Sequence, residues 1–398
     1  MKIKQRKSSF PAGQGNEWLS TALLYGSAMD IQRHYKLALT VLFFLAAYYQ
    51  HRNDRNPRIR KRIQRGALFF CLPIAALYFI QIISLPHLSI LKTGLLYTNI
   101  YILAIICIVD MRSYEDIEYY VSIFSNFAIL ISIISIYNTI RTGISVGRMA
   151  AGFNFSKNYI SAIVYLTFPL LLFYLREYRE KKRAKLSYKV LVALILGSIV
   201  CLLSSSRTVL GVVVIIFIAI LFQKERNIRR AIEKILGILA VAGILLLVYY
   251  NAPNIRRGID RALVITSLEG RSSRNRLIEF GLAEFYASNH FIGTGSNLMP
   301  YPGYSAPIPV HNMFVEILLA TGIIGFVIFL LLNTRFYMIL ISRCNTRGLF
   351  YLLMLLGAML ITAFFQPFFT TIYYPSLVVQ ISAMLITLDS ERTGRISV

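Results

Sequence analysis

The chain has 398 residues, of which 56 % are hydrophobic and 15 % charged, and 42 Lys and Arg against 18 Asp and Glu give a formal charge of +24. Soluble domains carry about 25 % charged residues. The composition, with a mean hydropathy of +0.60, disfavours a secreted disulfide scaffold, a disordered tail and a soluble nucleic-acid binder, and it predicts an all-α polytopic membrane protein with no nucleic-acid partner.

Eleven apolar runs are read as membrane spans, since a spanning helix needs roughly 20 apolar residues. They lie near 35–50, 66–85, 88–109, 119–140, 158–175, 189–205, 208–223, 231–250, 313–333, 349–365 and 372–388. A shorter, mostly apolar stretch at 18–31 adds a twelfth. We therefore expect about 12 transmembrane helices, 11 clear and one short, in a single integral membrane domain over residues 1–398.

The basic loops orient these spans. Lys and Arg are concentrated at 51–65, 176–189 and 224–234, and short loops rich in these residues stay in the cytoplasm. Counting the twelfth span also places the basic N-terminus inside. The same alternation puts three segments outside, namely 141–157, the Ser204–Arg207 turn and the long segment 251–312.

The predicted external cations are mostly arginine. The 251–312 segment has six arginines and no lysine: Arg256, Arg257, Arg261, Arg271, Arg274 and Arg276. The planar guanidinium is suited to bidentate binding of phosphate. This choice of residue indicates a phosphate or pyrophosphate ligand, although arginines attracted to lipid phosphates would give the same composition. The basic inner loops indicate contact with anionic membrane lipids.

Arg207 lies at the junction of two apolar runs that almost no loop separates. A charged side chain at such a depth is costly unless it faces a polar cavity, so Arg207 is a candidate functional residue. The alternative is that its side chain extends to the membrane interface. Arg148 lies near the outer end of another predicted span.

A short amphipathic helix is expected inside the external segment. Ser272 or Ser273 can cap it, and Ile278, Leu282 and Phe285 then recur at helical spacing. Its N-terminal end would carry Arg271, Arg274 and Arg276, where free backbone N–H groups and the helix dipole already favour an anion. A loop rich in glycine and proline follows, with Gly293, Gly295 and the stretch 300–309.

His311 and Asn312 open the next span. At that position His311 is either a proton acceptor or hydrogen-bond donor near neutral pH, or a helix cap. The predicted external acids are few: Asp30, Asp260, Glu269, Glu279, Glu284 and Glu316. They form neither a D-x-D pair nor a carboxylate cluster, so no metal site and no cofactor are predicted.

Four motifs in this order resemble the O-antigen ligase and Wzy-type polysaccharide polymerase superfamily. They are R-x-x-x-G with a nearby Asn (Arg148, Gly152, Asn158), S-x-S-R (Ser204, Ser206, Arg207), an arginine helix leading to G-x-G (Arg274, Gly281, Gly293, Gly295), and H-N before G-x-x-G (His311, Asn312, Gly322, Gly325). They span roughly 140–335. The family often has a proline before G-x-G, where this chain has His290-Phe291-Ile292.

The resemblance implies transfer of a glycan from an undecaprenyl-pyrophosphate carrier at the outer face of the bacterial cytoplasmic membrane. Arg207, with Arg274 or Arg271, would hold the pyrophosphate, and Arg148 would support it. His311 would orient or deprotonate the acceptor hydroxyl, with Glu279 a less favoured base. Arg276 and Asn312 would contact substrate. A flippase and a chain-length regulator are implied as partners in polysaccharide assembly.

Two activities within the superfamily, and one outside it, stay open at this point. A polymerase joins repeat units on the carrier, whereas a ligase moves the finished glycan onto lipid A-core. The external segment of about 60 residues is compact for a ligase, which favours the polymerase. A transporter of an anionic lipid-linked substrate would also need arginines, but such transporters usually contain internal repeats, and the two halves show no such symmetry.

Overall fold

The computed structural model describes part of the chain. The continuous described stretches are 79–83, 114–142, 157–177, 184–203, 207–222, 273–288, 290–296, 298–303 and 308–365. The other described positions are 76, 232, 236, 239, 243, 246, 247, 250, 256, 378, 381, 382, 384–386 and 389.

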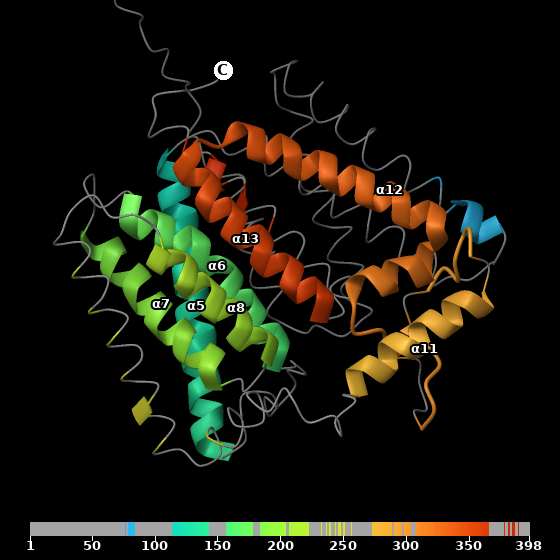
Figure 1. The fold of residues 1–398 in the computed structure, drawn as a ribbon. Helices are drawn as coiled ribbons and strands as arrows, with labels where there is room; N and C mark the ends of the chain where they lie inside the picture. The colour runs from blue at the N-terminus through green and yellow to red at the C-terminus, as the bar shows by residue number, and fades with distance from the viewer. Residues whose placement is uncertain are drawn as a thin grey trace, which may run out of the picture.

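The described stretches are mostly helical (Figure 1). In chain order the elements are α5 (Tyr114–Thr142), α6 (Lys157–Glu177), α7 (Ala184–Leu203), α8 (Arg207–Phe222), α11 (Ser273–Ala287), β1 (Leu298–Met299), β2 (Ile308–Pro309), α12 (Met313–Arg343) and α13 (Thr346–Phe365). Six of the predicted spans coincide with α5, α6, α7, α8, α12 and α13 and are helical, as predicted. The remaining predicted spans lie wholly or largely outside the described residues.

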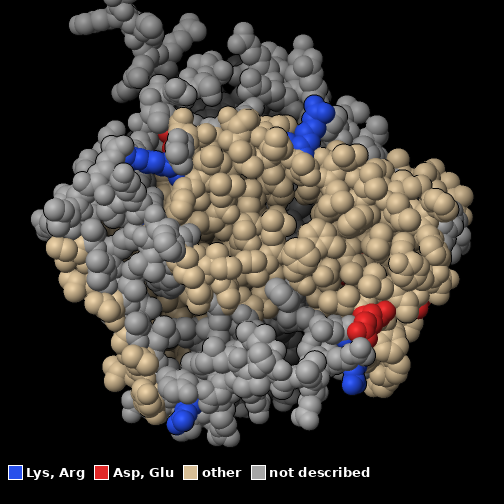
Figure 2. Space-filling view, in the orientation of Figure 1, with Lys and Arg blue, Asp and Glu red and all other residues tan. Residues whose placement is uncertain are grey.

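Two of the described helices, Met313–Ser342 and Arg347–Phe364, are long and apolar enough to cross a membrane. Three further stretches are apolar but shorter: Val121–Tyr137, Val164–Arg176 and Leu186–Cys201. Many large apolar side chains point outward, including Leu331 at 66 % exposure and Ile133 at 52 %. Figure 2 shows a broad face with few charged side chains among the described residues. A surface of this kind suits contact with lipid tails rather than water.

The helices pack into a bundle in which α5 and α6 run in opposite directions and α5 and α7 run in the same direction. Helix α5 packs on α6 and α7, and α13 packs on α6, α8 and α12. Near one end, the Tyr174 hydroxyl of α6 donates to Glu118 of α5 at 3.1 Å. At the same end, Lys189 of α7 donates to the Ser122 hydroxyl at 2.7 Å. Because this end adjoins the basic 176–189 loop, it is the end predicted to face the cytoplasm.

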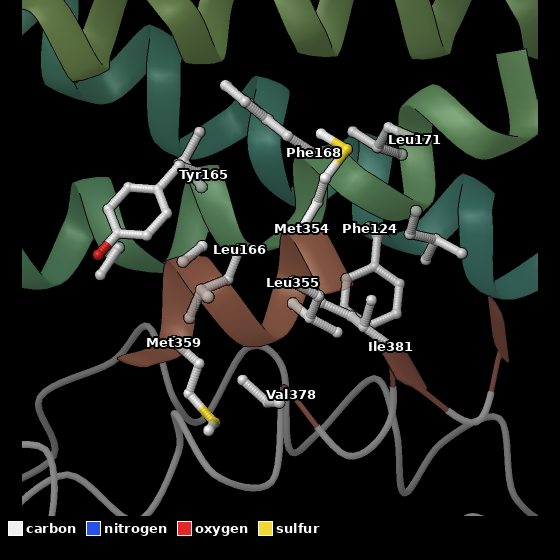
Figure 3. Close-up of a cluster of buried hydrophobic side chains, with 14 of the residues drawn as sticks. Phe124, Tyr165, Leu166, Phe168, Leu171, Met354, Leu355, Met359, Val378 and Ile381 are labelled. Carbon is white, nitrogen blue, oxygen red and sulfur yellow. The ribbon is translucent and has the colours of Figure 1, made fainter. Parts of the chain in front are cut away.

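The bundle core is built from aromatic and branched side chains of α5, α6 and α13. Phe124, Tyr165 and Phe168 are each no more than 2 % exposed, and they belong to one buried cluster with Met354 and Leu355 of α13 (Figure 3). Helices α6 and α7 approach closely because Gly197 has no side chain. An added Cβ there would lie 2.7 Å from Val164 Cγ1, so the contact depends on the small residue, as is common between membrane helices.

Helix α12 is broken at Gly322. That residue has φ 64° and ψ −172°, which no helical residue adopts, and the helix continues on both sides of it (Figure 1). The predicted span over 313–333 lies within this helix, as predicted, whereas the break at Gly322 is a feature that the apolar run does not indicate. The cause is tertiary, because the loop after α11 docks at the break. A second difference lies in the predicted glycine- and proline-rich loop, which includes the paired strands β1 and β2.

Candidate functional site at the outer end of the bundle

Helix α11 packs on the first half of α12. Its buried face consists of Leu277, Gly281 and Phe285, which join Val310 and Leu319 in a small separate core. Phe285 lies on this face as predicted, whereas Leu277 and Gly281 take the places predicted for Ile278 and Leu282. A Cβ on Gly281 would lie 2.7 Å from Val310 Cγ2. The helix therefore turns the glycine inward, and Ile278 and Leu282 are only partly buried.

The charged residues of α11 lie where the sequence predicts them. The helix begins at Ser273, so Arg274 is on its first turn. Arg276 and Glu279 are exposed and lie away from the buried stripe. The arginines are thus near the N-terminal end of α11, where the backbone N–H groups attract an anion. Arg271 lies outside the described residues.

The loop after α11 fills the break in α12. The amides of Thr294 and Gly295 donate to the carbonyls of Leu319 and Ala320 at 2.8 and 3.0 Å. In return, the amides of Ile323 and Ile324 donate to the carbonyls of His290 and Phe291 at 2.8 and 3.2 Å. The four bonds satisfy backbone groups that the break would otherwise leave without partners.

Two glycines make this docking possible. Gly293 has φ 72°, and a Cβ there would lie 2.5 Å from the Gly322 amide nitrogen. A Cβ on Gly322 would lie 2.3 Å from the Phe291 carbonyl oxygen. Both clashes are with backbone atoms, which cannot rotate away. The G-x-G and G-x-x-G motifs are therefore brought into direct contact, and their first glycines hold the two segments together.

Gln81, which is not among the residues predicted from the sequence, also holds this junction. Its side chain is 0 % exposed, and its Nε2 donates to the Ala320 carbonyl at 2.6 Å and to the Ile292 carbonyl. Among the described residues its Oε1 has no hydrogen-bond partner. Its position within the apolar run 66–85 could have indicated this role, because polar side chains inside spans usually bond to a neighbouring segment.

His311 and Asn312 lie at the start of α12, as predicted. Asn312 is the N-cap, and its Oδ1 accepts from the amides of Phe314 and Val315 at 2.9 and 3.1 Å. The alternative that His311 caps the helix is therefore wrong. His311 precedes the cap and is half-buried, with its Nδ1 buried.

Contacts between helix ends bring the start of α12 to one end of the bundle. Asn312 Nδ2 donates to the Phe364 carbonyl, near the end of α13, at 3.2 Å. Two residues earlier, Thr362 shares a hydrogen bond with the hydroxyl of Tyr165, in the first half of α6. Cys201, near the end of α7, contacts the Ser161 carbonyl on α6. This end is opposite the one that adjoins the basic loop, so it is the end predicted to face outside.

The same end includes the first residue of α8, Arg207. Helix α7 ends at Leu203, three residues before α8 begins, and α8 packs on α13. Thus the backbone positions of Arg207, His311 and Asn312 lie at one end of the bundle, on helices that share α13 as a neighbour. The α11 residues Arg274, Arg276 and Glu279 belong to the unit that packs on the first half of α12. Arg148 lies outside the described residues.

This arrangement combines cations with a histidine at the end of an apolar bundle. Arginine neutralises phosphate charge, and a half-buried imidazole can exchange a proton near neutral pH. Within the part of the chain that the structure describes, no three His, Cys, Asp or Glu side chains group closely enough to hold a metal ion.

Apolar helices with an outward apolar surface, a helix broken in its span and a polar assembly at one end are typical of a helical membrane protein. The comparison with protein families is more specific. Residues 190–330 match the family model described as O-antigen ligase, which confirms the resemblance found in the motifs. The match covers about a third of the chain and includes Arg207 and the residues of α11 and of the start of α12, but not Arg148. No curated protein matches the chain.

Proposed function

We propose that the protein is a polymerase that joins polyprenyl-pyrophosphate-linked oligosaccharide repeat units at the outer face of the cytoplasmic membrane. The observation that supports this most is the convergence of the ends of α7, α8, α12 and α13, which brings Arg207, at the start of α8, and the H-N motif to one end of the bundle. Arginine at one motif and histidine at the other are the groups that such a transfer needs.

In the proposed reaction the acceptor hydroxyl attacks the anomeric carbon of the donor sugar. The bond from this carbon to the pyrophosphate oxygen breaks, and its electron pair leaves with the polyprenyl pyrophosphate. Arg207, with Arg274 or Arg271, stabilises the charge that develops on the leaving group, supported by Arg148. His311 accepts the hydroxyl proton, and Glu279 is the less favoured base because it lies exposed on α11. This scheme uses no metal ion.

The outward apolar surface of the helices suits the polyprenyl chain of the donor, which stays in the bilayer while its pyrophosphate reaches the arginines. Membrane lipids and the lipid-linked glycan are thus the proposed partners, together with a flippase that supplies the donor and a regulator of chain length. The active site would face the periplasm or the cell exterior.

Ligation to lipid A-core is the second candidate, favoured by the description of the matching family. The two reactions share the donor and differ in the acceptor. The compact external segment, about 60 residues over 251–312, leaves less protein to bind a large second lipid, and this favours polymerisation.

Purified protein in lipid nanodiscs, supplied with a polyprenyl-pyrophosphate oligosaccharide, tests the proposal. A ladder of longer glycans on the carrier supports the polymerase, and product only after addition of lipid A-core supports the ligase. Movement across a bilayer without new glycosidic bonds would instead identify a transporter.

The Arg207→Ala variant is expected to lower turnover about 10²-fold or more, since it removes a charge-stabilising donor. Arg335→Ala is the matched control, because Arg335 is an exposed arginine in the second half of α12. Equal activity of the two variants, with both proteins folded and inserted, would refute the assignment of Arg207.

A further inference from the structure

Two phenylalanines that the proposed reaction does not use lie beside the H-N motif. Phe314 is on the first turn of α12, and Phe364 is near the end of α13. Their rings pack against each other, with centroids 4.9 Å apart and ring planes inclined at 47°. Phe314 is half-buried, whereas Phe364 is 52 % exposed. The pair therefore presents aromatic surface at the end of the bundle that is predicted to face outside.

Asn312 fixes the position of this pair. Its Oδ1 accepts from the Phe314 amide at 2.9 Å, and its Nδ2 donates to the Phe364 carbonyl at 3.2 Å. One short side chain thus connects the two backbone segments that carry the rings, and it joins the start of α12 to the end of α13. Rings that are already held in place lose little freedom when a ligand packs against them.

The exposed face of α13 changes in character at Phe364. Leu353, Leu360 and Phe364 are all exposed and recur at helical spacing, so they share one face of the helix. A lipid tail requires only apolar side chains on such a face, as the two leucines supply. A sugar requires a ring, because the C–H bonds on one face of a pyranose pack against the electron-rich face of an aromatic side chain. Its hydroxyls then reach polar groups at the edge of the ring, and the H-N motif supplies such groups here.

We propose that Phe314 and Phe364 form a subsite for a sugar ring of the acceptor glycan, and that Asn312 is the residue that positions them. The glycan packs one pyranose ring on the exposed aromatic surface and presents its hydroxyls to the adjoining H-N motif. That the sugar belongs to the acceptor rests on the proposed function, whereas the packing of a sugar on the two rings does not.

Saturation-transfer NMR of the full-length protein in nanodiscs tests the subsite without turnover. The probe is the oligosaccharide that mild acid releases from the polyprenyl-pyrophosphate repeat unit. Saturation of the aromatic protons of the protein is expected to reach the C–H protons of the sugar in the wild type and in Phe364→Tyr, and to be lost in Phe364→Leu. Phe350→Leu, near the start of the same helix, is the control and retains the transfer. Equal transfer in Phe364→Leu and the wild type, or none in the wild type, would overturn the subsite whether or not the protein elongates glycans.

The kinetics of elongation give a second test. Phe364→Leu keeps an apolar side chain but no ring, and it is expected to raise KM for the lipid-linked repeat unit about tenfold with little change in kcat, because it removes a contact made equally before and during the reaction. Phe364→Tyr is expected to stay within about twofold of the wild type. An unchanged KM in Phe364→Leu would refute the subsite and identify Phe364 as a lipid contact. A wild type that binds the oligosaccharide in the NMR experiment but does not elongate it would refute the polymerase and leave the subsite standing.

The positioning role of Asn312 is tested by Asn312→Ser. The serine hydroxyl still caps α12 but is too short to reach the Phe364 carbonyl. This variant is expected to raise KM about as much as Phe364→Leu does, and to add less than about twofold in a Phe364→Leu background, because residues that act as one unit are not additive. Full losses in both backgrounds would show that Asn312 does not act through Phe364.

Discussion

The docking of the loop onto the break in α12 leads to a prediction about Gly293. In Gly293→Ala the new methyl group would lie 2.5 Å from the Gly322 nitrogen and 2.7 Å from the Leu319 oxygen. These atoms are backbone, so the loop must move away rather than adjust. Gly303 is the matched control, because it has φ +83° and nothing within 4 Å of an added Cβ.

The expected magnitude follows from the bonds at risk. A left-handed conformation costs an alanine about 1–2 kcal/mol, and this applies equally to Gly293→Ala and Gly303→Ala. Gly293→Ala also loses up to four loop–helix hydrogen bonds of 2.8–3.2 Å, each worth about 1 kcal/mol. The loop should therefore be destabilised by about 3–6 kcal/mol in Gly293→Ala and by about 1–2 kcal/mol in Gly303→Ala.

Hydrogen–deuterium exchange in nanodiscs measures this difference directly. The amides of Thr294, Gly295, Ile323 and Ile324 are expected to exchange more than 10²-fold faster in Gly293→Ala and to stay protected in Gly303→Ala. Equal protection in the two variants would show that the contact between Gly293 and Gly322 does not keep the loop docked at the break in α12.

Three further predictions concern buried polar groups. Gln81→Leu removes the donor to two carbonyls and should cost about 1–3 kcal/mol, measured as a lower Tm in detergent together with faster exchange over 290–296. Burial, and secondarily the Asp389 charge, raises the pKa of Cys344 to about 12. The rate of alkylation of Cys344 at pH 8 should therefore be about 10³-fold lower than that of a free thiol, and it should increase with pH up to about 12. The rate should also be higher in Asp389→Asn, which removes the neighbouring negative charge. Tyr165→Phe should cost about 0.6–1 kcal/mol in SDS unfolding, because Thr362 keeps its bond to the Ala358 carbonyl at 2.6 Å.

The helices could be predicted because the length of an apolar run is itself the signal. Runs such as 119–140 and 349–365 coincide with α5 and α13 to within a few residues. The break at Gly322 could not be predicted in this way, because it depends on a loop that is distant in sequence. The same holds for Gln81, whose two acceptors lie more than two hundred residues further along the chain.

The sequence predicts where the residues of the candidate site lie on their helices, but not which groups they contact. Sequence placed His311 and Asn312 at the start of a span and Arg274 on the first turn of an external helix, and the structure has them there. The cap, however, is Asn312 rather than His311, because a short side-chain oxygen reaches the free amides better than an imidazole. Periodicity predicted Phe285 on the buried stripe of α11 correctly, but it gave Ile278 and Leu282 in place of Leu277 and Gly281, since a glycine does not count as a packing residue in such a pattern.

The motif residues are of two kinds: glycines that allow close packing, and an arginine and a histidine that are proposed to act in the transfer reaction. Gly281, Gly293 and Gly322 are explained by close approach of chain segments, since a Cβ at each would lie within 3 Å of a neighbour. Their presence supports a shared fold. The arginine at the start of α8 and the histidine before the cap of α12 are instead the residues on which the proposed chemistry depends. Loss of activity in a glycine variant would accordingly report loop docking, whereas substitutions at Arg207 and His311, in a protein whose loop amides remain protected, test the transfer reaction itself.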